Sequence, residues 1–201
     1  MPEVRVPPAR WERWLTNFAD RHGAAELVVR DGQLAGSAAN GSSFTAALPF
    51  ETAYDGPPEA TAFAAAAVPP KGWGVLLVRK GGYAVARLAG PAMVEHKIGQ
   101  RHVQGRTKAG GQSQQRFARR RDNQARQAYE AAADHAARVL AGTTVVVGGG
   151  DRAAVEAVLG DVRLARVRLV DPWLAVPDPR RAVLDQAVLD AQALRVEVIN
   201  A

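Results

Sequence analysis

Apolar residues near the start of the chain recur every three or four positions. Over residues 8–22 this spacing predicts an amphipathic helix that ends at Gly23. Its apolar stripe consists of Trp11, Trp14, Leu15 and Phe18. Such a stripe can serve as a partner surface, but its helical spacing favours a place in a hydrophobic core.

The next segment has the spacing of short strands. Two apolar stretches, at 27–29 and around Leu34, flank Asp31-Gly32, a dipeptide typical of hairpin turns. Residues 43–48 predict a third strand. Proline and glycine then indicate a loop, and we place a soft domain boundary between about 55 and 70.

A second strand-rich part follows Pro69-Pro70. Residues 73–79 and 83–88 flank Lys80-Gly81-Gly82, another hairpin pattern, and residues 92–97 predict a further strand. From 98 to 115 almost nothing is apolar, which is typical of an exposed loop. Residues 113–140 contain no proline or glycine and are rich in alanine, arginine and glutamine, so they predict a long helix.

The remaining pattern alternates strands and helices. Strands are expected at 143–147, 162–169 and 194–199, and helices at 151–159 and 178–191. This order predicts an α/β (mixed α+β) fold in which helices cover a mixed sheet. We expect two domains, an N-terminal extension of one helix and short strands at 1–65, and a main domain at 66–201.

Composition limits the kinds of site that the chain can hold and the cellular locations that we expect for it. The 201 residues include no cysteine, which excludes disulfides, thiolate metal sites and a cysteine nucleophile. No apolar run is long enough to span a bilayer, and the N-terminus lacks a signal core, so we expect a cytoplasmic protein. The abundance of alanine, arginine, glycine and valine is typical of GC-rich bacterial genes.

Charge is concentrated in one segment. Residues 97–138 contain ten Lys or Arg and three Asp or Glu, while the rest of the chain is nearly neutral. A basic segment on a neutral body is typical of a polyanion-binding protein. A solvated helix face is the alternative, and the scarcity of acidic residues here argues against it.

Several motifs have structural explanations. Gly148-Gly149-Gly150 stands between a predicted strand and helix, where phosphate loops occur, but it lacks the complete motifs and is interpreted as a tight turn. The four histidines show no zinc-ligand spacing, although His96 and His102 flank the basic loop and could contact phosphate. Asp151, Asp161 and Asp171 are interpreted as turn and cap residues.

One motif combines unusual residues with a basic setting. Gly110-Gly111-Gln112 lies in the predicted loop, directly before the predicted helix. Adjacent glycines adopt backbone angles that side chains forbid, and they permit close approach to a ligand. Free N–H groups at a helix start favour negative charge, so the Gln112 backbone can stabilise an oxyanion. A glutamine amide can also orient water, although it is neither an acid nor a base.

The residues around this motif resemble a known family. Thr107 to Arg121, read as TKAGGQSQQRFARRR, with Tyr129 further along, is similar to the middle domain of archaeal and eukaryotic class-I peptide release factors. The resemblance implies their fold, with a long helix after an exposed GGQ loop. The sequence shows no codon-reading motif, and we expect neither a codon-reading domain nor the domain that binds a partner GTPase. It therefore looks closest to stand-alone Vms-like release factors of ribosome rescue.

The resemblance implies a peptidyl-tRNA hydrolase that acts on the large ribosomal subunit, without cofactor, metal or membrane, as a monomer. The implied catalytic residues are Gly110, Gly111 and Gln112. The implied RNA-binding residues are Arg106, Lys108, Arg116, Arg119, Arg120 and Arg121. Two alternatives stay open, namely cleavage within the tRNA acceptor end and a non-catalytic role in binding the ribosome or RNA.

Overall fold

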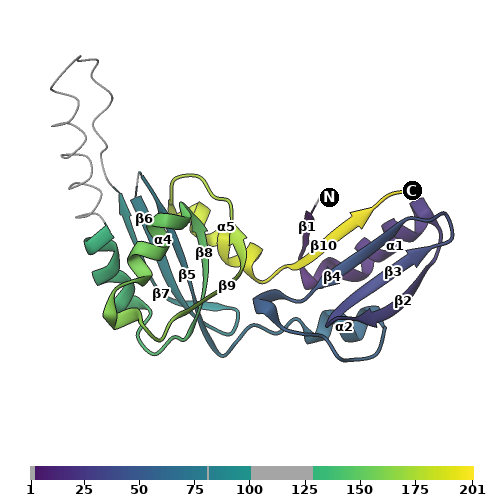
Figure 1. Ribbon diagram of the computed structural model, residues 1–201, viewed down its shortest axis with the longest axis horizontal. Helices are drawn as coiled ribbons and strands as arrows, with labels where there is room; N and C mark the ends of the chain where they lie inside the picture. The colour runs from purple at the N-terminus through teal and green to yellow at the C-terminus, as the bar shows by residue number, and fades with distance from the viewer. Residues whose placement is uncertain (1–2, 81, 101–128) are drawn as a thin grey trace, which may run out of the picture. The chain divides into compact units, whose positions relative to one another are not determined.

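The computed structural model describes residues 3–80, 82–100 and 129–201. The chain divides into two compact units, one formed by Met1–Pro70 with Val188–Ala201 and the other by Lys71–Ala187. Each unit contains a five-stranded sheet with helices (Figure 1). The mixed α+β class expected from the sequence is therefore confirmed.

The sheet of the first unit is antiparallel, in the order β1-β10-β4-β3-β2. Asp31 and Gly32, with φ of 51° and 73°, form the turn between β2 and β3, as the sequence predicts. The strands of this sheet are β1 (Glu3–Val6), β2 (Ala25–Arg30), β3 (Gln33–Ala38), β4 (Ser43–Ala47) and β10 (Leu194–Ile199). Its helical elements are η1 (Pro8–Arg10), α1 (Trp11–His22), η2 (Pro49–Glu51) and α2 (Ala60–Ala66).

An aromatic core joins α1 and α2 to one face of this sheet. Phe44 of β4 meets Trp11, Trp14 and Phe18 of α1 edge to face, at ring-centroid distances of 5.1 to 5.8 Å. Phe63 of α2 packs on Trp11 from the other helix. The aromatic stripe predicted at residues 8–22 is thus confirmed as core.

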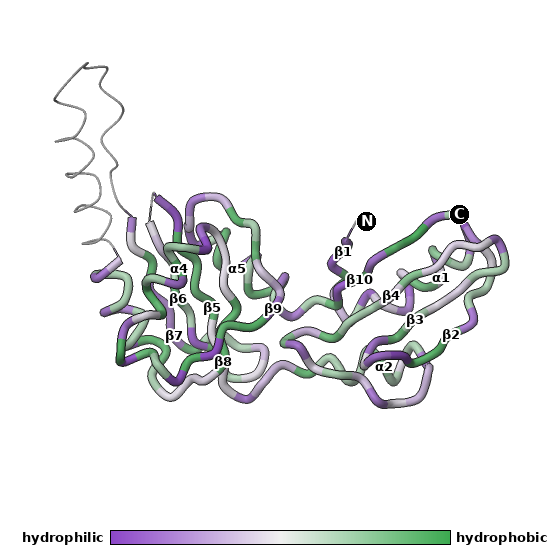
Figure 2. The backbone as a smooth tube through the Cα atoms, in the orientation of Figure 1, coloured by the Kyte–Doolittle hydropathy of each residue, from purple (hydrophilic) through white to green (hydrophobic). Residues whose placement is uncertain are grey.

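The last strand has an alternating pattern that suits a sheet covered on one side. Leu194 and Val196 of β10 are fully buried in the aromatic core, while Glu197 is exposed. Figure 2 shows the resulting polar (purple) and apolar (green) stretches along β10. A strand with this period-2 pattern buries one face and leaves the other to water.

The sheet of the second unit has the order β7-β6-β5-β8-β9. Its first three strands are antiparallel, whereas β8 runs parallel to both β5 and β9. The strands are β5 (Gly72–Arg79), β6 (Gly82–Ala89), β7 (Ala92–Gln100), β8 (Val145–Gly150) and β9 (Arg168–Leu174). The named helical elements are α4 (Arg152–Leu159), η3 (Val162–Leu164) and α5 (Arg181–Ala191), and residues 129–139 are also helical.

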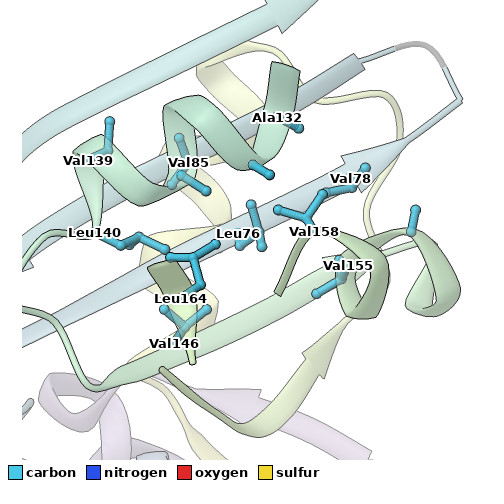
Figure 3. Packing of buried hydrophobic residues seen from close by; sticks show 13 residues of the cluster. Leu76, Val78, Val85, Ala132, Val139, Leu140, Val146, Val155, Val158 and Leu164 are labelled. Carbon is cyan, nitrogen blue, oxygen red and sulfur yellow. The ribbon is translucent and has the colours of Figure 1, made fainter. Parts of the chain in front are cut away.

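Helices cover this second sheet on both faces. Alanines of the helix at 129–139, together with Val155 and Val158 of α4, pack on Leu76, Val78 and Val85 of one face (Figure 3). Ala86 of β6 points to the opposite face, as does its partner His96 on β7. Because Arg181 contacts His96, the first turn of α5 lies on that opposite face.

Four expectations need correction or restriction. The strand expected at 162–169 begins only at Arg168, because Asp161 caps the turn of η3 by accepting from Arg163 N–H. The helix α2 was not expected. The strand β10, expected in the domain at 66–201, pairs instead with β1 and β4 of the first unit. The helix expected over 113–140 lies within the described residues only from 129.

Candidate functional site

The residues predicted to carry chemistry fall in one segment outside the described residues, 101–128. They are Arg106, Lys108, Gly110, Gly111, Gln112, Arg116, Arg119, Arg120 and Arg121. His102 lies in the same segment. What the structure does describe is the sheet and helix from which this segment starts and to which it returns, the end of β7 at Gln100 and the helix at 129–139.

A chain of charged contacts holds the C-terminal end of that helix on the sheet. Arg138 of the helix forms an ion pair with Glu95 of β7. Glu95 also pairs with Arg87 of β6, with 3.4 Å between Oε2 and Nη2. Arg87 in turn donates from Nε to the carbonyl oxygen of Val139, at 3.1 Å. A cation on these last helical carbonyls satisfies an acceptor that the helix leaves free.

The other end of the same sheet face has an aromatic contact. The ring of Tyr83 on β6 stacks on His135 of the helix, with 5.9 Å between ring centroids. The ring also lies across Gly99 of β7, where an added Cβ would be 2.3 Å from Tyr83 Cε1. Burial raises the pKa of the Tyr83 hydroxyl, so this group stays neutral at physiological pH.

A cleft of about 230 Å³ opens beside Tyr83. It is formed where the β5–β6 hairpin, the end of β7 and the first described turn of the helix at 129–139 meet. The side chains and backbone around it include Val78, Lys80, Tyr83, Gly99, Tyr129 and Ala132. The cleft therefore borders both ends of the segment that carries the predicted site.

The triple glycine has a structural role, but it forms the end of β8 and not the tight turn expected from the sequence. Gly148 makes room for Leu169 and Trp173, because a Cβ there would be 2.7 Å from each. Gly150 has a φ of 93°, and its following residue, Asp151, donates its N–H to Val78 O at 2.8 Å. The Asp151 carboxylate caps α4 by accepting from Ala154 N–H. An anionic ligand is disfavoured there, since the cap already carries negative charge.

A second ion network links the helix at 129–139 to η3. Arg163 contacts both Asp134 and Asp161, each at 2.7 Å from Nη2. The side-chain and backbone hydrogen bonds from Arg163 hold the pKa of Asp161 down, at about 2, and the two carboxylates raise the pKa of Arg163. The interpretation of Asp151 and Asp161 as cap residues is confirmed. Asp171, expected at a turn or cap, lies instead within β9.

The described part of the chain contains neither a cluster of metal-ligating residues nor a membrane-spanning helix. Within residues 3–80, 82–100 and 129–201, no group of three or more His, Asp or Glu is placed to hold a metal ion. His96 contacts Arg181, and His22 contacts Asn40. Among these same residues, no helix combines the length and the apolar character needed to cross a membrane.

Sequence reasoning missed the contacts that hold the helix on the sheet. Arg87, Glu95 and Arg138 come from three elements, and Glu95 and Arg138 are 43 positions apart. A single acidic residue in the strand expected at 92–97 gives no sign of which cations it meets. The cleft was also not predicted, because it depends on how Gly82 and Gly99 sit beside a tyrosine.

Comparison with known proteins agrees with the resemblance to release factors that the sequence shows. A family model described as the Actinobacteria/chloroflexi VLRF1 release factor matches residues 71–197. This range begins where the second unit begins and contains Gly110-Gly111-Gln112.

The other comparisons add little. No curated protein matches the chain. Among solved structures, the chain is similar to one titled "Vms1 mitochondrial localization core", with 11% identity and a TM-score of 0.41 over 96% of this chain and 82% of that one. The family match decides which family the chain belongs to, because it covers more than half of the chain. On this match, the chain belongs to the Actinobacteria/chloroflexi VLRF1 release-factor family.

Proposed function

We propose that this protein rescues stalled ribosomes by hydrolysing the ester bond of peptidyl-tRNA on the large subunit. The observation that carries the proposal is the family match over residues 71–197, which contains an intact Gly110-Gly111-Gln112. The basic residues around this motif support it, because a polyanion such as ribosomal RNA would be their natural partner. Ribosomes are cytoplasmic, so the proposed activity is too.

In the proposed reaction, a water oxygen attacks the carbonyl carbon that joins the peptide to the terminal ribose. The bond to the ribose 3′-oxygen breaks, that oxygen takes up a proton, and the peptide leaves with a free carboxylate. The Gln112 backbone N–H stabilises the negative charge that develops, and its side-chain amide orients the water. Gly110 and Gly111 supply the backbone angles that bring Gln112 to the ester.

The basic residues bind RNA phosphates in this proposal. The residues are Arg106, Lys108, Arg116, Arg119, Arg120 and Arg121. Phosphate contacts release counterions, so affinity for the large subunit should fall steeply as salt concentration rises. These contacts would hold the protein on the subunit while the loop reaches the ester.

The described structure supports the proposal through the contacts of Glu95. Glu95 links β7, whose end leads into residues 101–128, to Arg138 in the helix that follows them. This contact lies at the end of the helix away from residues 101–128, and it fixes that helix to the same sheet from which these residues start at Gln100. A rigid attachment helps a catalytic loop, because accurate positioning of the reacting groups contributes much of the rate enhancement in such reactions.

The test is release of a labelled peptide from purified large subunits that carry peptidyl-tRNA. We expect the wild type to free the peptide and leave the tRNA intact. Gln112→Ala and Gly111→Ala should be slowed by about 100-fold or more, the size expected for loss of a positioned transition-state contact. A thermal melt and a subunit-binding assay of each variant serve as controls for folding and association.

The products separate this proposal from its alternatives. A shortened tRNA, with its CCA end left on the peptide, would replace ester hydrolysis by cleavage in the acceptor end. Binding of wild type and Gln112→Ala without any release would leave a non-catalytic ribosome-binding role. Full activity of Gly111→Ala would contradict the assigned role of the glycine pair.

A further inference from the structure

The cleft beside Tyr83 has no assigned role. Its volume of about 230 Å³ is below the roughly 300–1,000 Å³ typical of clefts for drug-sized ligands. One planar ring system is the size of group that such a space accepts. The cleft lies at the end of β5, opposite to the end at which Lys71 precedes that strand.

Two glycines let Tyr83 lie against β7 beside this cleft. At Gly82, which has a φ of 152°, a Cβ would be 2.3 Å from Gly99 O, and at Gly99 a Cβ would meet the Tyr83 ring. A side chain at Gly99 would therefore displace Tyr83, and one at Gly82 would overlap the backbone of β7. Buried Val78 and Ala132 contribute its apolar lining, and Tyr129 faces it from the helix at 129–139.

The cations at the cleft differ in their availability. Arg79 is engaged, because its guanidinium donates to Val176 O at 3.1 Å and lies near Asp178. Lys80 is exposed, and no described residue forms an ion pair with it. None of the described residues that line the cleft is acidic. Aromatic rings beside an exposed cation are the combination that binds unpaired nucleotides, the ring with the base and the cation with the phosphate.

We propose that this cleft binds one unpaired nucleotide of RNA, with the base against Tyr129 and a phosphate at Lys80. An unpaired nucleotide is required, since a base within a duplex has no free face to stack. The inference rests on the proposed function only for the source of the RNA, which would be the ribosome or its tRNA. It adds a contact between RNA and the second unit, beside the residues that flank positions 101–128.

The test uses a short single-stranded RNA labelled with a fluorophore and the full-length protein. Tyr129→Leu keeps apolar volume and removes the ring, so it should weaken binding about 10-fold, whereas Tyr129→Phe should bind as the wild type does. Lys80→Gln should lower the slope of log affinity against log salt by about one phosphate contact. Lys71→Gln, at the other end of β5, is the matched control and should leave the slope unchanged.

Crosslinking locates the contact and keeps the result independent of stability. An RNA that contains 4-thiouridine should crosslink to peptides that include Tyr83 or Tyr129. Crosslinks confined to residues 101–128, or equal RNA affinity of Tyr129→Leu and wild type, would overturn the proposal. Lys80→Gln that behaves as Lys71→Gln does would overturn the phosphate contact.

The outcomes also separate this inference from the proposed hydrolase activity. Gln112→Ala should bind the RNA normally and fail in peptide release. If RNA binding depends on Tyr129 and wild type releases no peptide, only the hydrolase proposal fails. If peptide release depends on Gln112 and RNA binding ignores Tyr129 and Lys80, only the cleft proposal fails.

Discussion

Replacement of Gly150 by alanine should destabilise the second unit strongly. Gly150 has a φ of 93°, in the region that residues with a Cβ avoid. The new Cβ would be 2.3 Å from Val78 O. That oxygen cannot move away freely, because it accepts the N–H of Asp151. The substitution therefore combines backbone strain with a steric overlap.

The two effects can be separated by a control. Left-handed backbone costs a residue with a Cβ about 1 kcal/mol, and an overlap in a packed region costs about 1–3 kcal/mol more. We expect a total loss of about 2–4 kcal/mol for Gly150→Ala. Gly142 has a φ of 76° and no atom within 4 Å of an added Cβ, so Gly142→Ala should cost only about 1 kcal/mol.

Hydrogen exchange as a function of urea gives the unfolding free energy of one unit at a time. Peptides that cover β5 and β8 report on the second unit, while peptides of β3 and β4 should not change. Equal losses for Gly150→Ala and Gly142→Ala would refute the steric argument. Protection of Gly150 peptides by added phosphate would refute the structural reading of the triple glycine.

Three further predictions concern acid stability, the aromatic core and salt. Asp161 has a lowered pKa of about 2, so its contribution to stability is complete above its ordinary pKa of 3.8 and is lost as pH falls toward 2. Asp161→Asn should therefore make the urea midpoint depend less on pH over this range, and an unchanged pH dependence would contradict the Arg163 contact. Phe44→Ala should cost about 3–5 kcal/mol in the first unit, whereas Val28→Ala, at a half-exposed position, should cost under about 1 kcal/mol by the same exchange measurement. Arg119→Gln should reduce the salt slope of large-subunit binding by about one, and an unchanged slope would remove Arg119 from the RNA contacts.

Local patterns predicted much of the fold. The Asp31-Gly32 turn and the spacing of Trp11, Trp14 and Phe18 involve residues close in sequence, so both were predictable. The helix α2 was missed because it is short and follows a proline-rich stretch, with Phe63 as its one large apolar residue. Alternation at 162–169 was misleading, because the cap formed by Asp161 determines the local backbone there.

Long-range arrangements were harder to predict. The sequence pattern identified residues 194–199 as a strand, but nothing local indicated a partner near residue 45. The same limit applies at the candidate site. Gly110-Gly111-Gln112 was recognisable from the sequence, and its role stays a prediction. The pairing of Glu95 with Arg138 depends on sheet register and helix placement, which the pattern of apolar and polar residues does not encode.

The position of β10 has a consequence for how the protein is made. This strand lies between β1 and β4, yet it is synthesised after the entire second unit. Domains ordinarily fold in order as they leave the ribosome, but the sheet of the first unit is complete only once β10 has joined β1 to β4. Until then, β1 has no partner and β4 exposes an open edge. The second unit can therefore complete its fold on the nascent chain while the N-terminal unit is still an unfinished sheet.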